Sequence, residues 1–123
     1  MSDIKQQIKD NLGAQSYCYR HFKDNATVIE KLKASGVSKI ELCGVHADFT
    51  DESSFDGIIK QYGDAGVEIV SIGVQGLNGE EAKERHYFEF ARRAGAKFMS
   101  CSFGVTSVPV SYTHLTLPTI LRV

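Results

Sequence analysis

Several side chains able to take part in chemistry stand at or just beyond the ends of apolar segments of the sequence. They are Tyr19, Arg20, His21, His46, Asp48, Gln75 and Ser102. Histidine side chains can exchange a proton under physiological conditions, so His46 could orient a substrate hydroxyl or move a proton. The guanidinium of Arg20 could grip a phosphate. Each has a structural alternative: His46 as a loop histidine, Tyr19 and His21 as loop packing, and Arg20 as a surface residue.

Acidic side chains form a second group of candidates. Glu41 lies within an apolar segment, where a carboxylate must be hydrogen-bonded or paired, and this favours a structural role. Asp48, Asp51 and Glu52 stand close together on a polar loop and are better suited to capping the next helix than to holding a metal. His86 stands among charged residues and is typical of a solvated helix position. No metal site is predicted.

A repeated phrase indicates how these side chains are positioned. A helix end, a glycine and the start of an apolar segment recur around Gly36, Gly66 and Gly95, at intervals of 30 and 29 residues. That interval is the length of one strand, loop and helix of a parallel α/β sheet. After a short helix at about residues 3–9, we predict four strands, at residues 12–19, 39–45, 68–74 and 97–103. Helices starting near Asp24, Phe55 and Glu80 would join them.

Four strands with three crossover helices fit either an open doubly wound sheet or the first half of a (β/α)8 barrel. A nucleotide-binding sheet needs a glycine-rich turn after its first strand, but residues 17–24 contain no glycine. Polar and apolar residues also alternate along the strands, as in a barrel wall that has helices outside and a narrow interior. An example is Ser71, Gly73 and Gln75 opposite Val70, Ile72 and Val74. We therefore predict the N-terminal half of a TIM barrel, truncated after its fourth strand.

Composition narrows the class of protein further. With 123 residues and 42% hydrophobic content, the chain can bury one modest core, and its net charge of −1 excludes nucleic-acid binding through bulk charge. The sequence contains no signal-peptide pattern and no run of about 20 apolar residues, so we expect a cytoplasmic protein with no membrane partner. Cys18, Cys43 and Cys101 lie far apart in apolar patterns, and we expect buried thiols.

The sequence changes character after Gly104. Residues 110–119 carry no charge, no helical period and a poor strand pattern, and all of them match the translation of a transposase adaptor used in DNA library preparation. We therefore assign residues 1–109 to a partial barrel domain and residues 110–123 to a non-native, adaptor-derived tail. An ordinary C-terminal tail is the alternative.

Four phrases of the sequence resemble the N-terminal half of sugar phosphate isomerase/epimerase proteins, which belong to the xylose-isomerase-like barrel superfamily. The phrases are residues 12–17, 37–42, 66–71 and 90–97. They recur in members with different substrates, so they indicate a superfamily rather than a reaction. The resemblance implies proton transfer next to a carbonyl. It also implies a divalent metal (Mn, Mg or Zn) held by two Glu, an Asp and a His of later strands, and no position of this chain matches those ligands.

The resemblance also implies a sugar or sugar phosphate as the partner, with Tyr19, His21, His46 and Gln75 in the substrate wall. A polyol dehydratase of the inosose type and a non-catalytic sugar-binding barrel are the alternatives. The zinc endonucleases of the superfamily are strongly disfavoured, because Gln75 and Ser102 stand where the resemblance would require histidine ligands. Lacking the later strands, the chain alone is expected to be inactive and to hold no metal. Its open sheet edges predict self-association.

Overall fold

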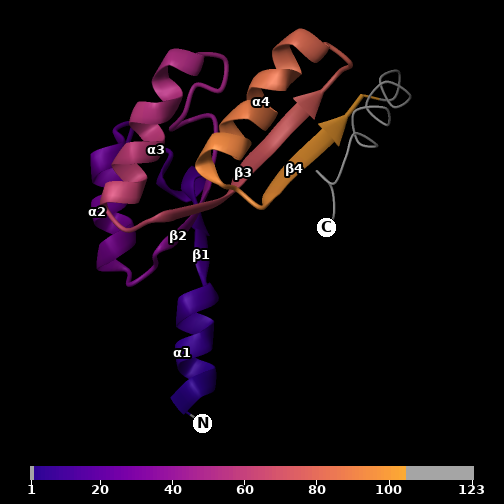
Figure 1. The fold of residues 1–123 in the computed structure, drawn as a ribbon. Coiled ribbons are helices and arrows are strands. Elements are labelled where there is room, and N and C mark those ends of the chain that lie inside the picture. Colours follow the sequence, from indigo (N-terminus) through magenta and orange to yellow (C-terminus); the bar gives the residue numbers. More distant parts are fainter. Residues whose placement is uncertain (1, 105–123) are drawn as a thin grey trace.

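The computed structural model describes residues 2–104, which form an α/β unit around one parallel sheet (Figure 1). The sheet has four strands in the order β1-β2-β3-β4, each parallel to its neighbour. The elements are α1 (Ser2–Asn11), β1 (Gly13–Gln15), the 3-10 helix η1 (Ser16–Tyr19), α2 (Asn25–Ala34), β2 (Lys39–Leu42), the 3-10 helix η2 (Glu52–Ser54), α3 (Phe55–Asp64), β3 (Glu68–Leu77), α4 (Glu81–Ala94) and β4 (Phe98–Phe103). The predicted α/β class, with four parallel strands and three crossover helices, is confirmed. The tail assigned to residues 110–123 lies outside the described residues.

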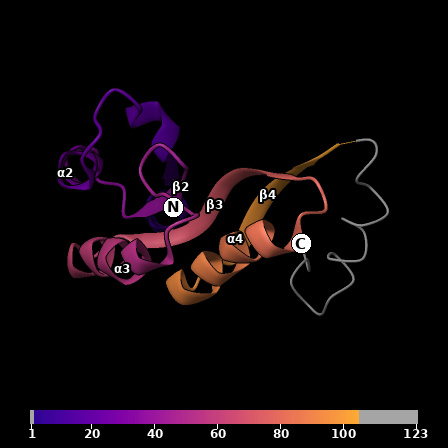
Figure 2. The ribbon, with the colours of Figure 1, turned by 90° about the horizontal axis from the view of Figure 1, so that it is seen from above.

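The crossover helices α2, α3 and α4 follow one another along one side of the sheet (Figure 2). The strand order runs with the chain and never reverses, whereas a doubly wound sheet reverses its order at a switch point. This arrangement is consistent with one half of a TIM-type barrel. Helix α1 extends away from the sheet below β1 (Figure 1).

The ends of the helices show why the glycine phrase repeats. Gly36, Gly66 and Gly95 follow the last residues of α2, α3 and α4 and have φ angles of 71°, 75° and 70°. These left-handed angles stop a helix at little cost only when the residue is glycine. At the other end of α2, the carboxylate of Asp24 accepts a hydrogen bond from the backbone N–H of Thr27 at 2.8 Å.

A carboxylate of α4 itself holds the loop that precedes this helix. Glu84 is only 3% exposed, and its Oε1 accepts hydrogen bonds from the backbone N–H groups of Asn78, Gly79 and Glu80. A negative charge at this place also suits the positive end of the helix. Glu84 is thus the residue that fixes the β3–α4 loop.

The hydrophobic core lies between the sheet and the three crossover helices. Ile40, Leu42 and Ile72 of the sheet are fully buried against the helices. The ring of Phe90 lies edge-on to those of Phe49 and Phe55, with centroid distances of 4.9 and 5.0 Å. Apolar spacing of three and four residues puts Phe55 and Phe90 on the buried faces of α3 and α4, whereas Phe49 comes from the loop before η2. No helix among residues 2–104 is long and apolar enough to cross a membrane.

The structure corrects the first predicted strand, which is much shorter than residues 12–19. Strand β1 ends at Gln15, because the side-chain amide oxygen of Gln15 accepts a hydrogen bond from the N–H of Tyr17 and starts the turn of η1. The turn carries Cys18 to the surface, so the prediction of a buried thiol there is wrong. Cys43 is buried as predicted, and Cys101 is half-buried.

The alternation predicted for the third strand also breaks down. Residues Ile72 and Gln75 of β3 pair with Met99 and Cys101 of β4, so three steps on one strand match two on the other. Residues two apart on β4 point to the same face of the sheet, so Ile72 and Gln75 must also share a face. The bulge therefore moves the β3 residues that follow it to the face opposite to the one that strict alternation predicts. Val74 is consequently 67% exposed instead of lying in the core.

Candidate functional site

A row of hydrogen-bonded polar side chains crosses the face of the sheet that the helices leave uncovered. Glu41 alternates with the core residues Ile40 and Leu42, so its side chain points to the opposite, helix-free face. Sheet register places Gln15 and Ser71 directly beside it on the neighbouring strands. We call Gln15, Glu41 and Ser71 the polar row.

Both oxygens of the Glu41 carboxylate are used within the polar row. Oε1 accepts a hydrogen bond from Gln15 Nε2 at 2.6 Å, and Oε2 accepts one from Ser71 Oγ at 2.7 Å. The hydrogen bonds expected for a carboxylate inside a strand are thus present. A charged acceptor held between two strands aligns them and still has lone pairs to offer.

Close backbone packing lies immediately beyond the polar row, toward the carboxyl ends of the strands. A Cβ atom on Gly73 would stand 3.1 Å from Cys43 Cβ and 3.3 Å from Gln15 Nε2. Ser16 Oγ accepts a hydrogen bond from the Cys43 N–H at 2.8 Å and lies 3.0 Å from its sulfur, to which it can donate. Glycine at position 73 and serine at position 16 therefore let β1, β2 and β3 approach at this end of the sheet.

His46 is buried, with 5% of its surface exposed, in the loop that follows β2. Its Nε2 lies 2.8 Å from the carbonyl oxygen of Phe22, and because a carbonyl only accepts, Nε2 carries the proton. Its Nδ1 has no hydrogen-bond partner among the described residues. The backbone carbonyl of His46 accepts a hydrogen bond from Asn25 Nδ2 at 2.9 Å. This placement suits the structural alternative, a histidine that clamps two loops.

Tyr62 of α3 extends the same clamp. Its hydroxyl donates to Asn25 Oδ1 at 2.7 Å, which orients the Asn25 amide toward the His46 carbonyl. Burial, and to a smaller extent the neighbouring Cys43 thiol, raises the pKa of the Tyr62 hydroxyl, so it stays protonated and donates. The loops after β1 and β2 are thereby tied to α3. We call Asn25, His46 and Tyr62 the loop clamp.

The other predicted substrate residues do not gather around His46. Tyr19 is half-buried and packs against the core, while His21 is exposed. Gln75 is 8% exposed, and its Nε2 donates to the carbonyl of Gly73 at 2.6 Å. The bulge turns Gln75 to the face of Met99, which packs on the core, so Gln75 lies on the helix side of the sheet. Arg20 is exposed, and its guanidinium lies 5.0 Å from the centre of the Tyr17 ring.

The acidic loop before α3 has a structural use. Asp48 Oδ1 accepts hydrogen bonds from the hydroxyl and the N–H of Thr50, which lower the pKa of Asp48. Asp51 Oδ1 accepts hydrogen bonds from the hydroxyl and the N–H of Ser53, and a carboxylate oxygen of Glu52 lies 3.6 Å from the Arg93 guanidinium of α4. Within the described part of the chain, no group of three or more His, Cys, Asp or Glu side chains could hold a metal ion. The side chains of residues 2–104 therefore do not fit a divalent metal.

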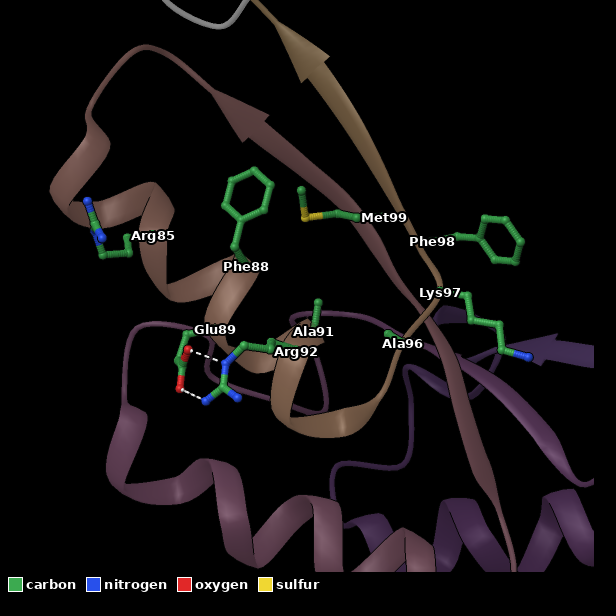
Figure 3. Close-up of a pocket in the computed structure, with 9 residues that line it drawn as sticks. All are labelled: Arg85, Phe88, Glu89, Ala91, Arg92, Ala96, Lys97, Phe98 and Met99. Atoms are coloured by element: carbon green, nitrogen blue, oxygen red, sulfur yellow. Dashed lines mark hydrogen bonds and ion pairs between the residues drawn. The ribbon is translucent and has the colours of Figure 1, made fainter. Parts of the chain in front are cut away.

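A groove of about 470 Å³ lies between α4 and β4, where the sequence indicates no site (Figure 3). Met99 points toward Phe88 across the groove, whereas Phe98 points away from it. The side chains around it are Arg85, Phe88, Glu89, Ala91, Arg92, Ala96, Lys97, Phe98 and Met99. The groove lies beside the start of the outer strand β4.

The parallel sheet with sequential strand order, one-sided helices and a polar row on the free face defines the chain as a half-barrel α/β protein. A scan against protein-family models gives no match, and a search of the curated proteins gives none either.

Sequence reasoning singled out Glu41 and noted the polar position of Ser71. It missed Gln15, whose only signal is a polar residue inside an apolar segment.

Proposed function

We propose that the chain is the N-terminal half of a sugar or sugar phosphate isomerase/epimerase barrel of the cytoplasm, whose reaction is proton transfer next to a carbonyl. The polar row carries this proposal. It lies on the face that becomes the interior when such a sheet closes, and its amide, carboxylate and hydroxyl are groups that recognise sugar hydroxyls. The family phrases in the sequence support the same class.

In this proposal the polar row orients a polyol. The Glu41 carboxylate has about four lone-pair positions and uses two of them within the row, so it can accept further hydrogen bonds from substrate hydroxyls. Tyr19 and His21, on the segment between β1 and α2, would form a wall beside the ring. The loop clamp would hold that wall in place, with His46 acting through the Phe22 carbonyl instead of touching the sugar.

The reaction itself needs groups that residues 2–104 do not bring together. A divalent metal would supply polarisation of the carbonyl, and the described side chains form no cluster for it. We therefore propose that the chain on its own binds a sugar weakly and does not turn it over. A polyol dehydratase would use the same polar row, and product analysis of the parent enzyme would separate the two reactions.

Titration of the ¹⁵N-labelled chain with a panel of aldoses, ketoses and their phosphates tests the binding. We expect amide shifts at Gln15, Glu41 and Ser71, with an affinity at least about fivefold weaker in Glu41→Gln, because a charged acceptor binds hydroxyls more strongly. Glu68→Gln is the matched control, since Glu68 is exposed at the start of β3. Shifts spread elsewhere, or equal affinities in the two variants, would contradict the proposal. Turnover with added Mn²⁺ or Mg²⁺ would contradict inactivity of the chain alone.

A further inference from the structure

On the outer strand β4, the residue next to the polar row is apolar. Ser71 pairs with Phe98, so the two side chains share the helix-free face of the sheet. Phe98 is 55% exposed and points away from α4 and the groove (Figure 3). The face thus ends, on its β4 side, in a large apolar side chain that is more than half exposed.

The two outer strands of the sheet are complementary in direction. Within residues 2–104, β1 pairs with β2 alone and β4 pairs with β3 alone, and all strands run the same way. The outer edges of β1 and β4 therefore each present backbone donors and acceptors for a parallel strand. Because β1 and β4 lie at opposite edges, each edge of one copy can pair with the other edge of a second copy.

We propose that a second copy of this chain closes the sheet, with β4 of each copy pairing in parallel with β1 of the other. The pairing is two-fold symmetric, so the same contact occurs twice and leaves no edge for a third copy. Four strands from each copy make eight, the number at which side chains alone fill a closed barrel. Closure would cover Phe98 and place the two polar rows inside one shared interior.

This inference rests on the edges of the sheet and on Phe98, and it does not depend on sugar binding. Light scattering after size-exclusion chromatography measures the mass over a range of concentrations. We expect a mass of about twice 13.6 kDa that does not grow with concentration. A monomer would overturn the proposal. Growth to larger assemblies would overturn it too, because it would mean that the edges pair without closing.

A matched pair of substitutions tests whether the two copies meet at Phe98. Phe98→Asp puts a carboxylate into the closed interior beside the Glu41 row, and we expect the dimer dissociation constant to rise at least about tenfold. Phe22→Asp removes an exposed phenylalanine of the loop before α2, which is not part of a sheet edge and has Lys31 Nζ 4.5 Å from the centre of its ring, and it should leave the dimer unchanged. Circular dichroism checks that both variants fold. Equal dimerisation of the two variants would overturn the proposal.

Hydrogen exchange gives a second readout that a fold defect would not mimic. In the dimer, the amides of β4 and β1 should exchange more slowly than in Phe98→Asp, because closure pairs their outer edges. The amides of β2 bond within the sheet in both states and should exchange alike. Slower exchange confined to other elements would place the contact elsewhere and overturn the β4–β1 pairing.

Discussion

Ser71 Oγ donates a hydrogen bond to Glu41 Oε2 at 2.7 Å across the helix-free face of the sheet, and this contact joins β2 to β3 immediately after a bulge in their pairing. The bulge lies between Ile40 and Glu41, where the register of the two strands shifts. Without the shift, Glu41 would not face Ser71. The hydrogen bond between Ser71 and Glu41 therefore depends on this register shift, which places the members of the polar row side by side.

Removing this hydroxyl should weaken the fold. Ser71→Ala leaves one oxygen of a half-buried carboxylate without its partner, and we expect a loss of about 1–2 kcal/mol in the free energy of unfolding. Urea denaturation followed by circular dichroism measures it. Ser100→Ala, at an exposed serine of β4, should change stability by less than about 0.5 kcal/mol. Equal effects of the two substitutions would count against a structural contribution of the contact.

Glycine at position 73 is required by close packing. Gly73→Ala would place a Cβ 3.1 Å from Cys43 Cβ, and the strands must move apart to admit it, at an expected cost of about 1–3 kcal/mol. Gly76→Ala on the same strand meets only Ser102 Oγ at 3.9 Å and serves as the control. Thermal unfolding of the two variants compares them. A Gly73→Ala chain as stable as Gly76→Ala would show that β2 and β3 are not packed this closely.

The loop clamp should behave as one unit. Tyr62→Phe removes the hydroxyl that orients Asn25 and should lower stability by about 1 kcal/mol. Asn25→Ala should cost more, because it also leaves the His46 carbonyl without its donor. Once Asn25 is gone, Tyr62→Phe should cost less than it does in the wild-type chain, which a double-mutant cycle measures. Tyr17→Phe, at an exposed tyrosine, is the control, and strict additivity of the pair would argue against the clamp.

Acid should weaken the contact between Glu89 and the end of α4. Hydrogen bonds from Arg92 and then from Arg93 lower the pKa of Glu89 from 4.5 to about 2. Because the folded pKa lies below the unfolded one, the stabilisation is complete above pH 4.5 and is lost as the pH falls toward 2. Glu89→Gln should therefore flatten the stability profile between these values, while Glu30→Gln, on exposed α2 surface, should follow the wild type. Parallel profiles for Glu89→Gln and the wild type would refute the pairing.

The sequence alone was sufficient for the order and type of the elements from α2 to β4. Helix periodicity, the cap at Asp24 and the glycine stops at Gly36, Gly66 and Gly95 act between residues close in the chain, so they can be read without knowing the fold. The parallel, sequential sheet follows from their spacing, because each unit is long enough for one crossover helix.

The tertiary structure decided which polar residues meet. The polar row needs the bulge at Glu41, the placement of Gln75 follows from the bulge after Ile72, and the burial of His46 comes from contacts with residues more than 20 positions away. Bulges and loop clamps are set by packing between strands and loops distant in the sequence, which no local pattern encodes. Residue types and spacing therefore determined the half-barrel, and the register between neighbouring strands decided its polar interior.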